Sequence, residues 1–138
     1  MRNKLKIFGM VVLMLTTVIF MSSCNKNEKN IVGNWMVTSS PNQKDNQEIW
    51  SFRDNGSCSV TFEGEVLSGE YSLSNNSLSI TAKTEENDTY YGVNYQWDLN
   101  IDVLDKKEMS LSGTRKYMVM NGYNDSYIEK VSYNFKKK

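Results

Sequence analysis

The sequence predicts an all-β domain, an eight-stranded antiparallel barrel whose strands run up and down in chain order. The clearest observation is residues 93–103, "VNYQWDLNIDV", in which apolar and polar residues alternate without a break. Such alternation is typical of an antiparallel strand that packs on one face and meets water on the other. Beyond residue 23 no segment keeps a period of 3.6, so the sequence predicts no helix of consequence there.

Seven further segments alternate more loosely, and turn signals separate them. The eight predicted strands cover residues 31–38, 47–53, 57–62, 66–73, 77–83, 93–103, 109–117 and 127–135. Short turns at 54–56, 74–76 and 105–108 fall at one end of such a meander. The longer loops 39–46, 84–91 and 118–125 fall at the other end, together with the short 63–65. Closing into a barrel removes the exposed edges of the sheet.

The first 23 residues are predicted to be a signal peptide. Arg2, Lys4 and Lys6 precede an uncharged, mostly apolar run over residues 7–21, which is shorter than the roughly 20 residues of a membrane span. The following "MSSC" resembles a bacterial lipobox, which implies cleavage before Cys24 and attachment of lipid to its sulfur. An uncleaved anchor helix and a plain secretory signal are the alternatives. The predicted regions are a signal peptide over 1–23, a tether over 24–30 and a barrel domain over 31–138.

A chain anchored in this way is a lipoprotein of the bacterial envelope, and we expect it in the outer membrane, with the periplasmic or surface side left open. Cleavage before Cys24 removes three basic residues and leaves 13 basic and 16 acidic ones, a net charge of −3. This balance argues against nucleic acid as a partner, because nucleic acid selects a basic patch. The tail Lys136, Lys137 and Lys138 is either solvated or in contact with anionic lipid.

The residue types present argue against catalysis. The chain contains no histidine, which excludes Ser-His-Asp and Cys-His catalysis and imidazole metal sites. Glu85, Glu86 and Asp88 share a loop that could touch a cation, although a calcium loop needs more oxygen ligands at regular spacing. Cys58 alternates with apolar neighbours and is expected to be a small buried residue rather than a reactive thiol. We therefore expect no enzyme activity, no metal and no cofactor.

Three motifs, taken in order, resemble the small lipocalin-like domains found on lipoproteins of Gram-negative bacteria. They are "VGNWMV" at 32–37, "WSFRDNG" at 50–56 and "SGEYSLSNNSLSI" at 68–80. The resemblance spans residues 31–135 and implies a barrel with Trp35 as a plug at its closed end, where Gly33 lets a neighbouring segment approach closely. The larger lipocalins also place an arginine of the last strand on this tryptophan. Here the last strand ends in Phe135 and lysines, so no residue is assigned that role.

The candidate binding residues are aromatic side chains that the alternation places inside the barrel: Trp50, Phe52, Phe62, Tyr71, Tyr95, Trp97, Tyr133 and Phe135. An eight-stranded barrel is just wide enough to be filled by side chains or to hold one small ligand. Arg115 shares the inward parity and lies toward the open end. It pairs there either with a carboxylate of the barrel mouth or with an anionic ligand head group.

Two functions are compatible with these observations. The first is non-catalytic binding of a small apolar or amphipathic molecule at the open end, by Trp50, Phe62, Tyr71, Tyr95, Trp97, Arg115 and Tyr133. A plain packed core is the alternative explanation of the same rings. The second function is a structural or interaction module whose long loops contact an envelope protein or polysaccharide. Exposed Tyr90, Tyr91, Met118, Met120 and Tyr123 would favour it.

Overall fold

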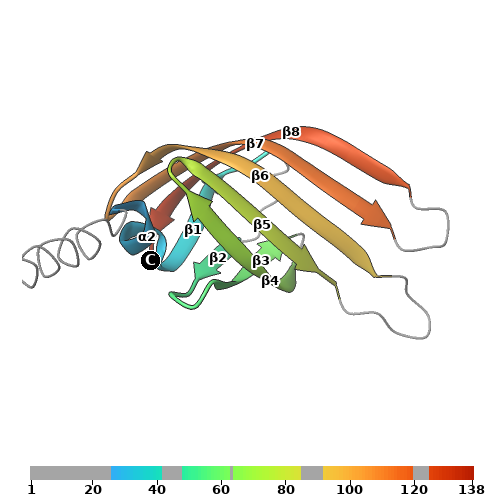
Figure 1. Ribbon diagram of the computed structural model, residues 1–138, viewed down its shortest axis with the longest axis horizontal. Coiled ribbons are helices and arrows are strands. Elements are labelled where there is room, and N and C mark those ends of the chain that lie inside the picture. Colours follow the sequence, from blue (N-terminus) through green and yellow to red (C-terminus); the bar gives the residue numbers. More distant parts are fainter. Residues whose placement is uncertain (1–25, 42–47, 63, 85–91, 120–124) are drawn as a thin grey trace, which may run out of the picture.

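The computed structural model describes residues 26–41, 48–62, 64–84, 92–119 and 125–138, which form one short helix and eight strands (Figure 1). The elements are α2 (Lys26–Ile31), β1 (Gly33–Ser39), β2 (Ile49–Phe52), β3 (Ser57–Phe62), β4 (Glu65–Ser74), β5 (Ser77–Lys83), β6 (Val93–Leu104), β7 (Glu108–Val119) and β8 (Ser126–Lys137). The predicted signal peptide and the predicted lipid-bearing Cys24 lie outside the described residues.

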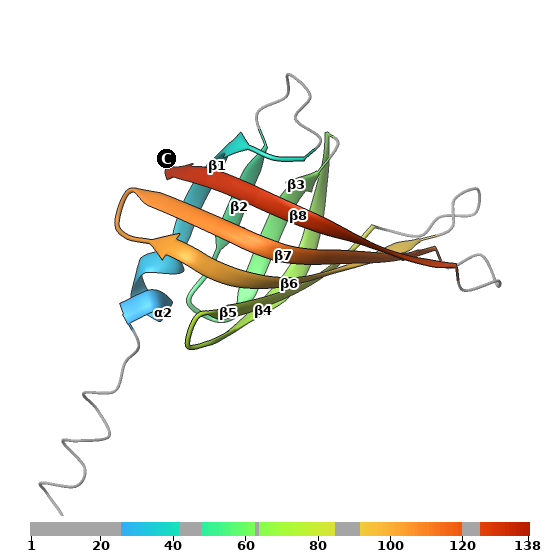
Figure 2. The same ribbon diagram turned by 90° about the horizontal axis from the view of Figure 1, so that it is seen from above.

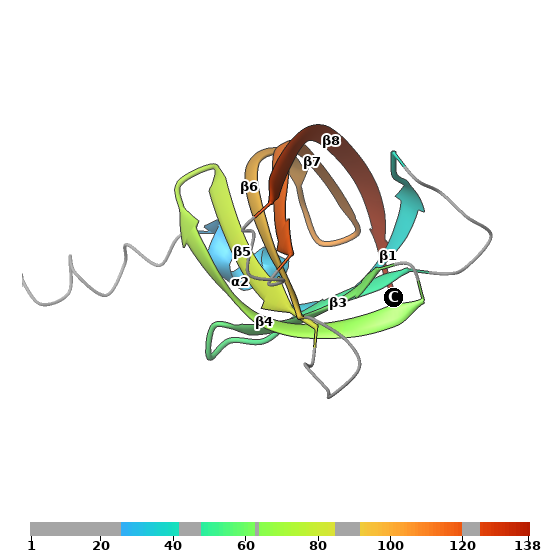
Figure 3. The ribbon, with the colours of Figure 1, turned by 90° about the vertical axis from the view of Figure 1, so that its right-hand side faces the viewer.

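The predicted fold is confirmed, because the strands form a closed antiparallel barrel. Each strand pairs with the next one in the chain, and β8 returns to pair with β1. At this seam Trp35 lies opposite Lys137, and Val37 lies opposite Phe135. A view along the barrel shows the complete ring (Figure 3). All eight predicted strands are present, and each of their ends lies within two residues of its prediction.

One end of the barrel, which we call the closed end, carries the three short turns that the sequence predicts. Gly56 and Asn75 have φ angles of 85° and 55°, the left-handed geometry that these residue types tolerate best. Asp105 organises the third turn, because its carboxylate accepts hydrogen bonds from the backbone N–H groups of Lys107 and Glu108 at 2.7 and 2.8 Å. The C-terminus and α2 lie at the same end (Figures 1 and 2).

Within the segment that the sequence predicts as a tether, a short helix begins at Lys26 and packs on the barrel. Ile31, the last residue of α2, is fully buried in the core. The side-chain amide of Asn27 donates hydrogen bonds to the backbone carbonyl of Asn75 at 3.1 Å and to Asn76 Oδ1 at 3.2 Å. A six-residue helix with a single apolar residue shows no periodicity, and its contacts with the barrel hold it. No helix in the described ranges is long and apolar enough to cross a membrane.

Trp35 fills the closed end from β1. Its side chain is fully buried, and Nε1 donates a hydrogen bond to the carbonyl of Ile31 at 2.7 Å. This bond ties the end of α2 to the first strand. The tryptophan therefore joins the helix to the barrel and seals the core beneath it.

Lys137, on β8, covers the same ring from the outside. Its ammonium lies 4.7 Å from the centre of the Trp35 ring and donates hydrogen bonds to the carbonyls of Asn30 and Val32 at 3.0 and 2.7 Å. Gly33 lies directly against this side chain, since a Cβ there would be 2.7 Å from Lys137 Cε. The expectation of a solvated or lipid-contacting tail is therefore corrected for Lys137, which is part of the closed end.

Two glycines let the strands coil tightly enough to close so small a barrel. A Cβ on Gly69 in β4 would lie 2.0 Å from the carbonyl oxygen of Thr81. A Cβ on Gly113 in β7 would lie 2.1 Å from the carbonyl oxygen of Asp98. Glycine inside a strand marks such a close approach of two backbones.

The opposite end is uneven, because three strands outrun the others. β6, β7 and β8 have twelve residues each, whereas β2 has four. Figure 1 shows the three long strands continuing past the rest of the barrel. Most of the predicted long loops lie outside the described residues, including Glu85, Glu86, Asp88, Tyr90, Tyr91, Met120 and Tyr123. Met118 is the exception and belongs to β7.

Candidate binding site at the barrel mouth

The register of β5 to β8 aligns inward-facing side chains in rows across the wall. One row consists of Ile80, Trp97, Arg115 and Glu129 on consecutive strands. The next row toward the open end consists of Ala82, Tyr95, Tyr117 and Tyr127. Residues two apart in a strand face the same side of a sheet, so both rows point into the barrel. The first row forms the floor of the barrel mouth, and the second row forms its wall.

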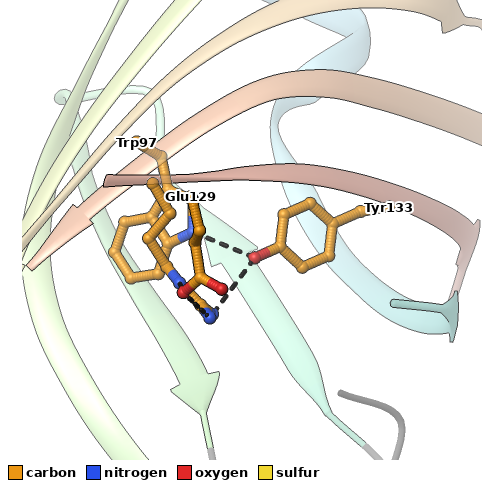
Figure 4. Close-up of polar contacts among 4 residues, drawn as sticks. Trp97, Glu129 and Tyr133 are labelled. Atoms are coloured by element: carbon orange, nitrogen blue, oxygen red, sulfur yellow. Dashed lines mark hydrogen bonds and ion pairs between the residues drawn. The ribbon is translucent and has the colours of Figure 1, made fainter. Parts of the chain in front are cut away.

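Arg115 is the one buried charged side chain of the described residues, with an exposure of 3%. Its Nε donates to Glu129 Oε1 at 2.9 Å, and its Nη2 makes an ion pair with the same oxygen (Figure 4). The guanidinium carbon also lies 4.4 Å from the centre of the Phe62 ring on the opposite wall, a cation–π geometry. The inward position expected from parity is therefore the observed one, and the partner is a carboxylate of the mouth.

Tyr133 links this ion pair to the core. Its hydroxyl oxygen accepts hydrogen bonds from Trp97 Nε1 at 3.2 Å and from Arg115 Nη1 at 3.4 Å (Figure 4). Burial raises the pKa of Tyr133, an effect that the neighbouring Arg115 charge partly offsets. The hydroxyl therefore stays protonated at neutral pH and acts as a neutral acceptor for two buried N–H groups.

The lumen below this floor is filled by side chains. Trp50 from β2 meets rings of the opposite wall, at centroid distances of 5.7 Å to Trp97, 4.8 Å to Tyr133 and 5.0 Å to Phe135. Because rings from facing walls touch, this level is a packed core. The indole N–H of Trp50 is buried and finds no acceptor among the described residues. Trp50 thus lies one layer deeper than the mouth.

The wall of the mouth is a row of three tyrosines, which we call the tyrosine row: Tyr95, Tyr117 and Tyr127. Their rings follow one another at centroid distances of 6.2 and 5.0 Å, and the second pair is stacked. Phe62 closes the row from β3, 5.3 Å from Tyr95. Tyr127 is 52% exposed, so the row leads from the core into solvent.

Sequence reasoning missed Glu129, Tyr117 and Tyr127 as site residues. The signal was present, because Tyr117 shares the parity of Arg115, and both Tyr127 and Glu129 share the parity of Tyr133. The predicted residues Phe62, Tyr95, Trp97, Arg115 and Tyr133 do come together at the mouth.

Tyr71 is, with Trp50, a predicted site residue that the structure places away from the mouth. Its hydroxyl donates to the carbonyl of Arg53 at 2.5 Å, and its backbone N–H donates to the carbonyl of Gly56 at 2.9 Å. Its ring packs against Phe52 at 5.0 Å. These contacts hold the first tight turn of the closed end in place.

A groove of about 590 Å³ lies on the outer face of the barrel, across β4 to β7. Its lining includes Ser68, Glu70, Thr81, Lys83, Gln96 and Lys116. These side chains belong to the outward-facing rows and are exposed or half-buried. Most of the lining is the solvated face of an antiparallel sheet, and Ala82, Tyr95 and Met118 add apolar surface to it. The mouth, with its buried guanidinium, is therefore the stronger candidate site.

The described residues offer little reactive chemistry. Cys58 is buried in β3, and burial raises its pKa to about 11, so the thiol stays protonated at neutral pH. Asp98 and Asp102 point away from the core on the exposed face of β6. Within the described ranges, no three His, Cys, Asp or Glu side chains gather in a way that would hold a metal ion.

The closed eight-stranded barrel is consistent with the lipocalin-like fold that the sequence motifs imply. Comparison of the chain with protein-family models, with curated proteins and with solved structures found no match.

Proposed function

We propose that this protein is a lipid-anchored lipoprotein of the bacterial envelope that binds a small amphipathic molecule at the barrel mouth, without catalysis. The polar head of the ligand meets Arg115 and Tyr133, and its apolar part lies along the tyrosine row. The observation that carries this proposal is the ion pair at the floor of the mouth. Arg115 is 3% exposed, whereas its carboxylate partner Glu129 keeps 39% of its side chain exposed.

The geometry of this pair leaves the guanidinium incompletely matched. Nε and Nη2 both bond to one oxygen, Oε1 of Glu129. Among the described residues, Nη1 makes only the long 3.4 Å contact with Tyr133. An arginine fork is best satisfied by an anion that presents two oxygens side by side. A ligand carboxylate that enters from solvent would supply that arrangement next to Glu129 or in its place.

The tyrosine row suits the remainder of such a ligand. Tyrosine rings combine a large apolar face with a polar hydroxyl, and pockets for small molecules are lined mainly by apolar and aromatic groups. The row continues upward from the Arg115 level, so head group and chain would contact adjacent rows. The lipocalin-like motifs and the lipobox-like "MSSC" support the same assignment from the sequence.

The ligand-binding part is tested by titrating the purified protein with a fluorescent long-chain carboxylic acid. We expect Tyr127→Ala to weaken binding roughly fivefold, the scale of one aromatic contact. Ile128→Ala is the matched control, because Ile128 is 68% exposed on the other face of the same strand. Equal affinity for the methyl ester of the probe, or equal losses in both variants, would contradict the proposal. Native mass spectrometry of the purified protein checks for a co-purified ligand.

The anchor has a separate test. Cys24→Ser removes the proposed lipid attachment, and we expect the variant to lose membrane association and the mass of the lipid. A variant that stays membrane-bound, unprocessed and unchanged in mass apart from the substitution would show that Cys24 carries no lipid.

A further inference from the structure

Basic side chains gather at the closed end. Lys26 on α2, Lys106 and Lys107 in the β6–β7 turn, and Lys136 and Lys138 at the end of the chain are all exposed. The backbone N–H of Lys137 donates to the carbonyl of Lys107 at 2.8 Å, which ties the turn to the last strand. Five exposed lysines from three separate segments therefore share one end, and we call them the closed-end lysines.

The carboxylates near them do not cancel this charge. Asp102, Asp105 and Glu108 lie on the β6–β7 hairpin, and Glu28 on α2, Asp54 in the β2–β3 turn and the C-terminal carboxylate lie at the same end. Hydrogen bonds from the backbone N–H groups of Lys107 and Glu108, with smaller contributions from the Lys107 and Lys26 charges, hold the pKa of Asp105 below its usual value. Glu108 pairs across the strands with Lys136. With Lys29, Arg53 and Lys137 counted, eight basic side chains meet five carboxylate side chains and the C-terminal carboxylate, an excess of two positive charges, whereas the chain from Cys24 onward carries a net −3.

The position of α2 brings this charge close to the predicted anchor. The helix begins at Lys26 and is docked on the closed end through Asn27 and Ile31. Cys24 is two residues before Lys26, and two residues span at most about 7 Å. That reach is shorter than the Debye length of roughly 8 Å at physiological ionic strength. A lipid on Cys24 would therefore hold Lys26, and with it the end of the barrel on which α2 is docked, close to the membrane surface.

From this arrangement we infer that the closed end is a membrane-contact surface for anionic phospholipid head groups. The closed-end lysines supply the attraction, and the barrel mouth points away from the bilayer. The orientation step rests on the proposed anchor. The attraction of the lysines to anionic lipid rests on the described residues alone.

The attraction is tested without the anchor. The chain from residue 24 with Cys24→Ser retains α2 and every strand of the closed barrel, with its complete described core. It is mixed with phosphatidylcholine vesicles that contain or lack phosphatidylglycerol, and bound protein is measured by flotation. We expect binding to the vesicles that contain phosphatidylglycerol, weakened by added salt, and none to pure phosphatidylcholine. Each lysine near an anionic surface contributes a factor of roughly five.

Matched triple variants locate the surface. Lys26→Gln, Lys106→Gln and Lys107→Gln together should lower binding by at least roughly tenfold. Lys83→Gln, Lys116→Gln and Lys130→Gln make the same change of charge on the barrel wall and should bind like the parent. Circular dichroism verifies that both triples fold. Equal losses in the two triples, or no binding of the parent to anionic vesicles, would overturn the inference. Titration of the parent with the fluorescent acid reports on the mouth separately, so the two proposals can fail independently.

Discussion

The ammonium of Lys137 lies 4.7 Å from the centre of the Trp35 ring, and the two residues are opposite each other where β8 pairs with β1. The lysine also donates to two backbone carbonyls at the start of the barrel. Lys137→Met should lower the free energy of unfolding by about 2 kcal/mol, because it removes the cation–π contact and leaves both carbonyls without this donor. Urea unfolding measures the change.

The adjacent Lys136 provides the control for this lysine. Its side chain is exposed, so Lys136→Met should change stability by less than about 0.5 kcal/mol. Similar losses of stability in the two variants would mean that the contacts of Lys137 with Trp35 and the two carbonyls do not stabilise the fold.

The Arg115–Glu129 pair should respond unequally to the loss of each partner. Glu129→Gln leaves a buried guanidinium without its counter-charge, and we expect a loss of about 2 kcal/mol, discounted for the exposure of the carboxylate. Arg115→Met leaves a half-exposed carboxylate that water can solvate, and we expect a loss of about 1 kcal/mol. Chemical denaturation of both variants gives the comparison, and the reverse order would refute this account of the pair.

The backbones of β6 and β7 lie so close at Gly113 that adding one methyl group there should lower stability strongly. Gly113→Ala would place Cβ 2.1 Å from the Asp98 carbonyl oxygen, and both strands would have to separate. We expect a loss of about 3 kcal/mol. At Gly64 a Cβ meets open space, but φ is 86°, so Gly64→Ala should cost about 1 kcal/mol from backbone strain. Thermal unfolding of the two variants tests this ranking.

Because the Cys58 thiol is buried, we expect the free energy of unfolding to fall in alkaline solution. This thiol ionises near pH 9.0 in the unfolded chain but near a pKa of about 11 in the folded one, because of burial. Between these values the unfolded chain binds fewer protons, so the free energy of unfolding decreases as pH rises, by about 2 kcal/mol over the interval. Cys58→Ala lacks this titration. A pH series of urea unfolding should therefore be flatter for the variant, and identical slopes would speak against the buried thiol.

The alternation of apolar and polar residues explains why both the barrel and the inward orientation of the Arg115 side chain could be predicted from the sequence. Strict alternation over 93–103 assigns each side chain to one face of the sheet. A partner strand then pairs in the register that places its own apolar residues on the same face. Arg115 follows the same rule, and the flanking Gly113 breaks neither the pairing nor the parity.

Parity does not reveal the height of a residue along the barrel. Tyr71 and Tyr95 both face inward, yet one lies beside a closed-end turn and the other at the mouth. Their positions along the barrel axis depend on the stagger between neighbouring strands, and this stagger is defined only when the barrel is closed. Lys137 was missed for a related reason, since a lysine at the end of a chain usually extends into solvent. Here its register with Trp35 gives it a ring and two carbonyls to contact.

The pairing of the first strand with the last also governs when the fold can be completed. The contact between Lys137 and Asn30 joins residues that are 107 positions apart, and most of the neighbouring strand pairs are local hairpins. In any process that delivers the chain from its N-terminus, β1 to β7 can pair in turn, while the second edge of β1 stays unpaired until β8 arrives. The side of the Trp35 ring that Lys137 covers therefore stays exposed, and the barrel stays open, until the final strand arrives.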